Sequence, residues 1–384
     1  MNHLQIGGDD RVEAVLEKTT VARQWLAAPT PNYQDRRPEV VLRVSAHIPA
    51  ASPAVVDVFE PAFRRLAAMS KGAIAVQAHW GGSLHHEREG IEALRSGLTD
   101  MCPVYSAWDA QMFPAAQILS LPFSFPSAEV ATQVAEEMYH DYFKGDFERQ
   151  GVLMGRMVAT SEYNLFSRNP IRTLEDLAGK KIACSPGLET QLFEALGADA
   201  VGCSTPQAKQ KFADQEVFAV SISDSAAHTV GLYREAAYRT AANLVQVNLE
   251  YGLSKDFYQR LSPPLRLILN QWLRGLAQAG AQLFYGLAGA RAREAFNQAG
   301  LQSLTLSAPE QARWREKLSG VEAVLLSEMK NLGYPAIRMR SEMRALSQKY
   351  AQHSANELMQ NALNHPLMNL LPGLTPDAIG SDNA

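Results

Sequence analysis

Ser225 and His228 are spaced so that they could act on the same molecule. Ser223 and Asp224 precede the histidine, and both residue types commonly begin helices. In the helix that follows, Ser225 and His228 lie one turn apart on one face. A histidine titrates near neutral pH and can move a proton to or from a bound molecule. The spacing predicts a polar or general-base site, or else a helix cap beside a solvated or hydrogen-bonded histidine.

Glu162, which is followed by Tyr163 and Asn164, is a second candidate for chemistry. A carboxylate can bind an amine or a hydroxyl group, and it acts as a base if burial raises its pKa. The alternative is a charged residue at the solvated end of a strand. Glu162 and His228 are therefore the two candidate catalytic residues, if the protein is an enzyme.

Other reactive groups in the sequence have simpler explanations. Cys184 and Cys203 fall on two predicted strands that should be neighbours, and buried structural cysteines are commoner than reactive thiols. His85 and Glu89 lie four residues apart, but no third metal ligand is identifiable, so a solvated helical turn is favoured. The sequence has no G-x-S-x-G, Walker, G-x-G-x-x-G or H-E-x-x-H motif. We therefore expect neither a metal nor a cofactor.

Composition narrows the class of protein. The chain has 384 residues, of which 46% are hydrophobic and 20% charged, and its formal net charge is −4. A chain of this length can bury large cores and should form two lobes or domains. The near-neutral charge gives no reason to expect a nucleic-acid partner. Residues 1–30 lack the features of a secretory signal, and on that ground we expect a cytoplasmic location. The oligomeric state stays open.

Strands and helices alternate along most of the chain. Apolar runs predict strands at residues 40–45, 73–78, 181–184 and 217–222, with helical patterns between them. This order favours an α/β fold with parallel-rich sheets flanked by helices. An amphipathic helix is predicted over residues 11–27, and the chain is nearly all helical after Pro263, with a helical tail over residues 337–371.

Residues 170–186 have the most informative local pattern. They predict a short helix that is capped at Thr173 and stops at Gly179, followed by a strand that ends at Ser185-Pro186. This block resembles the P-(hydrophobic)-x-x-x-x-D-L-x-G-x-K-(I/V)-R segment of the solute-binding proteins of TRAP transporters, the tripartite ATP-independent periplasmic importers.

Further landmarks of the same family follow in order. The matching segments are Gly82-Ser83-Leu84 with Glu89, Glu92 and Gly97, then Asp100-Met101, Leu121-Pro122-Phe123-Ser124-Phe125, Leu196-Gly197-Ala198, and Tyr233 to Tyr238. Together they cover about residues 40–335. The chain is therefore similar to a DctP-type solute-binding protein.

The resemblance implies a periplasmic-binding-protein-like fold, in which two lobes close around a ligand by hinge motion. The implied parts are an N-terminal extension at 1–38, lobe I at 39–158 plus about 247–285, lobe II at 159–246 plus about 286–335, and a C-terminal helical extension and tail at 336–384. The implied partners are a small-molecule ligand and the membrane permease subunits of a TRAP transporter. The location would then be periplasmic.

The cleft departs from the family pattern where the family grips a ligand carboxylate. The cleft arginine of the family corresponds to Ala183, and a second common arginine corresponds to Glu162. Apolar Phe218 and Ile222 replace polar positions, and Ser254 replaces an asparagine. A bidentate clamp on a carboxylate cannot survive these changes. We expect a less anion-binding, more apolar cleft that does not bind a simple C4-dicarboxylate or a sugar acid.

The resemblance also indicates which residues face the ligand. His47 follows the first strand, where the family contacts its ligand. Tyr105 and Trp108 form either an aromatic wall suited to a ring or part of the core. The full set of predicted ligand contacts is His47, Tyr105, Trp108, Glu162, Asn164, Ala183, Phe218, Ile222, Ser225 and Ser254.

Two functions remain open from the sequence. The first is a TRAP-type receptor that captures a small organic ligand, which the ordered family landmarks favour. The second is a non-exported enzyme or intracellular binder built on the same fold and acting on a less anionic substrate. The missing arginine and the missing signal features favour the second function.

Overall fold

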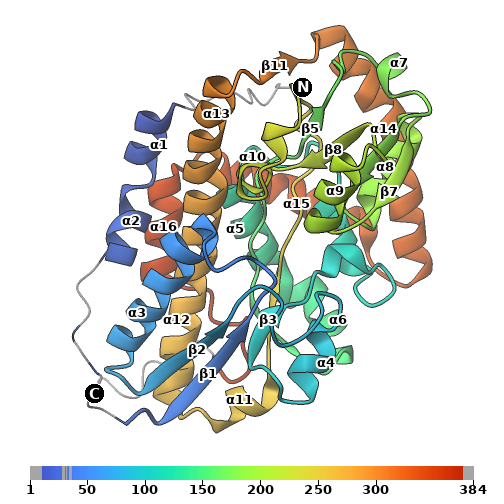
Figure 1. Ribbon diagram of the computed structural model, residues 1–384. Coiled ribbons are helices and arrows are strands. Elements are labelled where there is room, and N and C mark those ends of the chain that lie inside the picture. Colours follow the sequence, from blue (N-terminus) through green and yellow to red (C-terminus); the bar gives the residue numbers. More distant parts are fainter. Residues whose placement is uncertain (1–10, 28–30, 32, 34–36, 375–384) are drawn as a thin grey trace.

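The computed structural model describes residues 11–27, 31, 33 and 37–374, and its helices surround two separate β-sheets (Figure 1). We call the part built on the first sheet lobe I and the part built on the second sheet lobe II. The two-lobe α/β architecture predicted from the sequence is confirmed. Residues 1–10 and 375–384, which belong to the predicted terminal extensions, lie outside the described residues.

Lobe I contains a five-stranded sheet in the order β2-β1-β3-β10-β4. Its strands are β1 (Val40–Ser45), β2 (Ile74–His79), β3 (Met101–Pro103), β4 (Leu153–Arg156) and β10 (Tyr251–Leu253). β1 is parallel to β2 and β3, whereas β10 is antiparallel to both β3 and β4. β1, β3 and β4 therefore all point the same way, and their carboxyl ends meet at one edge of the sheet.

Helical segments cover this sheet. They are η1 (Ala54–Phe59), α3 (Glu60–Met69), α4 (Gly90–Arg95), η2 (Ser106–Trp108), η3 (Ala115–Ser120), α5 (Ala128–Met138), η4 (Tyr139–Phe143), α6 (Lys144–Arg149) and α11 (Lys255–Arg260). α3 packs against β2, and the buried side chains of Phe59, Ala62 and Leu66 join the core beneath it.

Lobe II contains a six-stranded sheet in the order β11-β9-β5-β8-β6-β7. Its strands are β5 (Asn164–Ser167), β6 (Lys181–Cys184), β7 (Asp199–Gly202), β8 (Ala219–Ile222), β9 (Tyr238–Ala241) and β11 (Gln302–Thr305). β5 runs antiparallel to both of its neighbours, and the other pairs are parallel. The helical segments of this lobe are α7 (Leu174–Leu177), α8 (Leu188–Ala195), α9 (Thr205–Ala213), α10 (Asp224–Thr229) and η5 (Leu232–Arg234).

In the described part of the chain, three stretches join the two sheets. Two of them cross side by side, with an isolated bridge between Ala159 and Asn248 and a hydrogen bond from the Thr160 amide to the Val247 carbonyl at 2.9 Å. The third is a long helix formed by α12 (Pro263–Ala279), the π-helical segment η6 (Gly280–Leu287) and α13 (Ala288–Gln298). α12 packs on α3 in lobe I and α13 packs on α10 in lobe II, so this helix spans both lobes (Figure 1).

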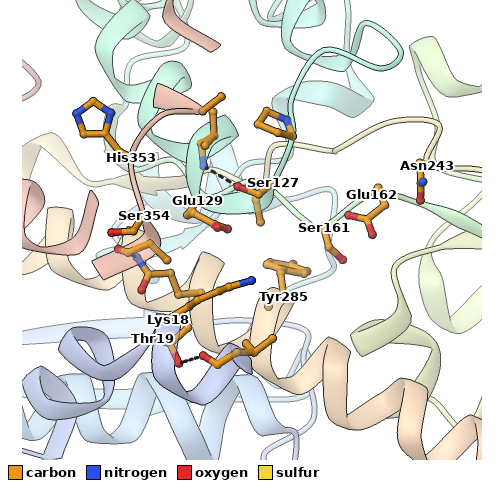
Figure 2. Close-up of a pocket in the computed structure, with 18 of the residues that line it drawn as sticks. Lys18, Thr19, Ser127, Glu129, Ser161, Glu162, Asn243, Tyr285, His353 and Ser354 are labelled. Atoms are coloured by element: carbon orange, nitrogen blue, oxygen red, sulfur yellow. Dashed lines mark hydrogen bonds between the residues drawn. The ribbon is translucent and has the colours of Figure 1, made fainter. Parts of the chain in front are cut away.

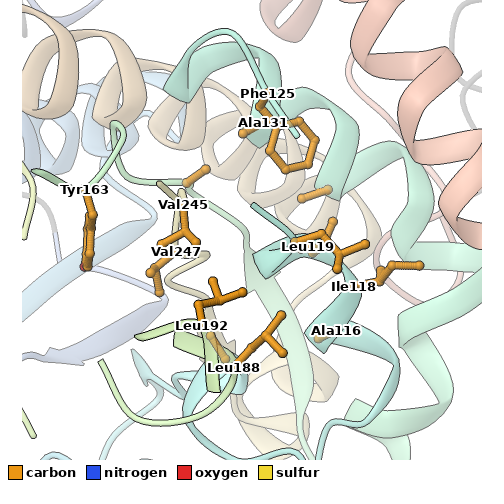
Figure 3. Close-up of a cluster of buried hydrophobic side chains, with 14 of the residues drawn as sticks. Ala116, Ile118, Leu119, Phe125, Ala131, Tyr163, Leu188, Leu192, Val245 and Val247 are labelled. Carbon is orange, nitrogen blue, oxygen red and sulfur yellow. The ribbon is translucent and has the colours of Figure 1, made fainter. Parts of the chain in front are cut away.

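The lobes also touch through an apolar contact far from the crossing strands. Leu188 and Leu192 of α8 belong to the same buried cluster as Ala116, Ile118 and Leu119 of η3 (Figure 3). α14 (Ala308–Asn331) contacts both α8 and η3 and so covers this contact. The structure therefore shows the two lobes closed against each other.

The chain's terminal helices pack together against the long helix. The helix predicted over residues 11–27 is interrupted at Thr19, which separates α1 (Val12–Lys18) from α2 (Thr20–Ala27). The Thr19 hydroxyl donates to the Val15 carbonyl at 2.8 Å, and such back-bonding disturbs a helix. α2 lies against α12 and α16 (Ala355–Asn364), and α15 (Ala336–Tyr350) lies against α5. No helix in the described part of the chain is long and apolar enough to cross a membrane.

Candidate ligand-binding site

The carboxyl edge of the lobe I sheet brings together side chains from distant parts of the sequence. His47 follows β1, Tyr105 follows β3, and Arg156 is the last residue of β4. Tyr251 pairs with Arg156 across the sheet and lies at the same edge. Ligands commonly bind outside the carboxyl ends of strands in α/β folds, so this edge is a candidate site.

Tyr105 and Trp108 form one aromatic wall of this site. Their rings are stacked with centroids 4.2 Å apart, and Tyr105 has a left-handed backbone with φ of 51°. The Ser106 amide donates to the Glu250 carboxyl group at 3.0 Å, which holds the loop in place. Glu250 is fully buried, and burial raises its pKa to about 7. The buried carboxyl group of Glu250 thus holds the loop that carries Tyr105 and Trp108.

His47 lies next to this wall. Its ring centroid is 6.4 Å from that of Tyr105, and its Nε2 lies 3.1 Å from the His85 carbonyl oxygen. Burial lowers the pKa of His47, so the ring is neutral at neutral pH. The second ring nitrogen, Nδ1, is buried without a hydrogen-bond partner.

A cavity of about 70 Å³ lies between this edge and the long helix. Side chains of mostly apolar or aromatic character line it, including Phe59, Tyr105, Arg156, Tyr251, Phe284 and Tyr285. Burial raises the pKa of Tyr251 to about 12 and raises that of Tyr285 further, so both phenols stay neutral. The cavity has room for a few water-sized groups, so a larger ligand requires its walls to move apart.

Lobe II closes over this region with the turn that follows β6. Glu189 holds the turn, because its carboxyl group accepts from the Ser185 amide at 2.8 Å and from the Ser221 hydroxyl at 2.5 Å. Gly187 of this turn lies against the backbone of Ala107 in lobe I. We call the turn from Ser185 to Gly187 the lobe II lip, because it is the part of lobe II that lies against lobe I here.

A larger pocket of about 510 Å³ surrounds Glu162 (Figure 2). It is lined by α1, the start of α5, η6 and the link between α15 and α16. Figure 2 shows Glu162 and Asn243 on one side, and Lys18, His353 and Ser354 on the other. Tyr285 lines both this pocket and the smaller cavity.

Glu162 faces charged residues of both signs in this pocket. Burial and the nearby Asp224 carboxylate raise its pKa to about 7, against the opposing effect of Arg293 and Arg239. Asp224 is buried and pairs with Arg239 at 2.7 Å and with Arg293 at 3.2 Å. Asn164 also donates to Asp224, at 3.3 Å. Glu162 and Asn164 therefore lie beside the ion pairs that Asp224 forms in lobe II.

Ser225 and His228 lie on α10, where the geometry is that of a capped helix. The Ser223 side chain accepts from the Ala226 amide, and the Ser225 hydroxyl lies 3.5 Å from that of Ser223. His228 stacks on Tyr233 with ring centroids 5.2 Å apart, and burial lowers its pKa. No contact joins His228 to Glu162 within the described residues, so the two candidate catalytic residues are not brought together.

Four predicted ligand contacts lie elsewhere. Ala183 and Ile222 are buried in the apolar cluster that also holds side chains of α9 and α13. Phe218 directly precedes β8 and Ser223 directly follows it, so the two residues lie at opposite ends of this strand. The Phe218 ring lies 5.4 Å from Lys180 Nζ. Ser254 caps α11 by accepting from the Phe257 amide. None of the four lines either cavity described above.

The other candidate reactive residues are buried or hydrogen-bonded within the protein. Cys184 and Cys203 are both buried and free, and burial raises the pKa of each thiol. His85 lies with Nε2 2.7 Å from the Ser45 hydroxyl, and Glu89 accepts from the His86 amide at 2.8 Å.

Sequence reasoning missed Arg156, Phe59, Tyr251 and Tyr285, which line the cavity. Arg156 ends an apolar run, Val152 to Gly155, and a cation at the end of a buried strand is a signal that could have found it. The aromatic residues carry no such signal, because rings in strands and helices usually belong to the core.

The fold and this cleft define a class of protein. The model of the family "Bacterial extracellular solute-binding protein, family 7", DctP, matches residues 45–326, and the chain belongs to this family. α1, α2, α15 and α16 lie outside the matched segment. The resemblance to TRAP solute-binding proteins predicted from the sequence is confirmed.

Individual relatives are more distant. The chain is 28% identical to the uncharacterized protein YiiZ of Salmonella typhimurium over 35% of this chain and 42% of that protein. It is 21% identical to a solute-binding protein of Chromohalobacter salexigens over 47% of this chain and 52% of that protein. The chain thus matches about half the length of these relatives, or less.

Solved structures resemble the whole two-lobe fold. A marine metagenome TRAP solute binding protein specific for aromatic acid ligands has a TM-score of 0.76 at 20% identity, covering 81% of this chain and 99% of that chain. A TRAP solute binding protein from Rhodoferax ferrireducens has a TM-score of 0.76 at 19% identity, covering 82% and 99%. One from Chromohalobacter salexigens has a TM-score of 0.70 at 16% identity, covering 79% and 99%.

Proposed function

We propose that this protein is a solute receptor whose preferred ligand is a small organic acid with an apolar, preferably aromatic, body. The observation that carries this proposal is the cavity between the lobe I sheet edge and the long helix. Its lining is apolar or aromatic, and it is neutral apart from Arg156. Rings such as Phe59, Tyr251 and Phe284 suit a flat apolar solute more than a polyhydroxylated or dianionic one.

The ligands of similar structures support the same chemical class. The marine metagenome protein was crystallised with metahydroxyphenylacetate, and the Rhodoferax ferrireducens protein holds copurified benzoate. The Chromohalobacter salexigens protein, which holds D-glucuronate, has the lower TM-score of 0.70.

Delivery to a membrane permease is the second part of the proposal. Family membership supports it, since the solute-binding proteins of TRAP transporters hand their ligands to permease subunits. Such a role places the receptor on the outer side of the cytoplasmic membrane. Co-expression with candidate permease subunits and uptake of a labelled aromatic acid would test this part separately from binding.

A thermal-shift series tests the binding proposal. Benzoate and 3-hydroxyphenylacetate should raise the Tm, because a ligand present at one hundred times its Kd stabilises the folded state by about 2.7 kcal/mol. Succinate and D-glucuronate at the same concentration should leave the Tm unchanged. A larger shift with succinate or D-glucuronate than with either aromatic acid would overturn the proposed ligand class.

A further inference from the structure

Arg156 is buried without a matching negative charge. Its side chain is part of a residue that is 4% exposed, and its Nε and Nη1 atoms have no hydrogen-bond partner. The nearby carboxylate of Glu136 is already engaged by Arg274 at 2.6 Å. Within the described residues, no carboxylate forms an ion pair with Arg156. Burying a guanidinium without a counter-charge costs free energy, so we expect such a group to bind an anion from outside the chain.

Aromatic rings fix the position of this guanidinium. Its central carbon lies 4.4 Å from the Tyr251 ring centroid and 5.0 Å from that of Phe59. These cation–π contacts stabilise the charge but leave Nε and Nη1 without a hydrogen-bond partner, because a ring face accepts no strong hydrogen bond. Nη1 lies beside Gly280 of the long helix, where a Cβ would be 3.4 Å from it. The guanidinium is thus held in place with free donors.

Arg156 belongs to the lining of the cavity described above. Arg156 lines it together with the rings of Tyr105, Tyr251 and Tyr285 and with apolar side chains of η1 and η6. Among the residues that the structure describes, no second cationic side chain lines this cavity. The cavity therefore presents one positive group to a ligand, and its other lining side chains are apolar or aromatic.

We infer that Arg156 binds the carboxylate of the solute and that the solute is a monoanion. This inference rests on the proposed function and names the residue that selects the ligand's charge. A guanidinium donates two parallel hydrogen bonds to one carboxylate, and a ligand carboxylate supplies the counter-charge that the described residues do not provide. A dicarboxylate would bring a second charge into a cavity without a second cation, so a single carboxylate is selected.

Isothermal titration with benzoate and benzamide tests the inference, because the two probes share a shape and differ in charge. The wild-type protein should bind benzoate at least about tenfold more tightly than benzamide. Arg156→Met should abolish this preference and leave benzamide affinity nearly unchanged. Arg156→Lys, which keeps the charge and loses the planar fork, should retain part of the preference. Arg315→Met is the matched control, since Arg315 lies 4.1 Å over the Phe123 ring, outside the cavity.

The outcomes separate this inference from the proposed function. Equal binding of both probes by the wild-type protein, or a benzoate preference that survives in Arg156→Met, would overturn the inference and leave solute capture intact. Failure of the wild-type protein to bind either probe would overturn the proposed function and the inference together. The unliganded Arg156→Met protein should melt no lower than the wild type, because it loses an uncompensated buried charge. If that variant does not fold, an unchanged preference in Arg156→Lys overturns the inference.

Discussion

Gly187 in lobe II lies so close to Ala107 in lobe I that a side chain at position 187 would clash with the Ala107 carbonyl oxygen. A Cβ built on Gly187 comes closer than 3.0 Å to that oxygen, a distance that real Cβ atoms essentially never show. Gly187 also has φ of 92°, in the region that glycine tolerates best. Closure of the two lobes therefore depends on the absence of a side chain at one position of the lobe II lip.

Gly187→Ala should weaken solute binding by hindering this closure. Benzoate affinity should fall at least about tenfold, because the closed state that buries the ligand becomes less populated. Gly197→Ala is the matched control, since Gly197 has φ of 94° but nothing lies within 4 Å of its built Cβ. Titration and small-angle scattering should show lost affinity and a more open shape for the first variant alone. Equal effects of both substitutions would contradict the role assigned to the contact.

Asp224→Asn should destabilise the protein. Asp224 is 2% exposed and its carboxylate is shared by Arg239 and Arg293, at 2.7 and 3.2 Å. Breaking a buried ion pair by removing one partner costs about 3 kcal/mol or more. Urea denaturation measures the loss. Glu175→Gln removes an exposed ion pair with Arg313 and should leave the midpoint nearly unchanged. A similar small effect of both substitutions would show that the Asp224 network contributes little to stability.

The buried Glu250 should make stability depend on pH. Burial raises its pKa from the usual 4.5 to about 7, so between these values the folded protein holds a proton that the unfolded chain releases. The contribution of Glu250 is fully present below pH 4.5 and is lost as the pH rises through about 7. It amounts to at most roughly 3 kcal/mol. Glu250→Gln should lose less unfolding free energy than the wild type between pH 5 and pH 8, and an identical loss in both proteins would contradict the assignment.

Trp25 should stabilise the packing of the N-terminal helices, α1 and α2, on the rest of the protein. It is 6% exposed, and its ring packs so closely on Gly275 that a Cβ at that glycine would lie 2.7 Å from the ring. Trp25→Ala should reduce the unfolding free energy by about 3 kcal/mol. Leu332→Ala, at a side chain that is 64% exposed, should change it by less than about 0.5 kcal/mol. Thermal unfolding at the wild-type midpoint in Trp25→Ala would show that these helices contribute little to stability.

Local pattern predicted much of the fold. The strands at residues 40–45 and 181–184 have the bounds that the sequence indicates, because apolar periodicity acts over a few residues. His85 and Glu89, which are expected on a helical turn, instead precede α4, which begins at Gly90. There the Glu89 carboxylate accepts from the His86 amide and the His85 ring lies against Ser45, so side-chain contacts replace the first helical turns.

The site was harder to predict than the fold. The resemblance predicts Ala183 and Ile222 as ligand contacts, but their side chains are buried among those of α9 and α13. Arg156 was missed because its environment is formed by Phe59 and Tyr251, which come from distant parts of the chain. A single sequence shows the arginine but not the rings that surround it.

A crystal structure of the protein with saturating benzoate tests the central claim most directly. The account predicts one benzoate in the cavity between the lobe I sheet edge and the long helix. Its carboxylate should meet Nε and a terminal nitrogen of Arg156, and its ring should lie among Phe59, Tyr251 and Tyr285. Benzoate bound instead in the pocket around Glu162, or an empty cavity at saturating concentration, would contradict the account.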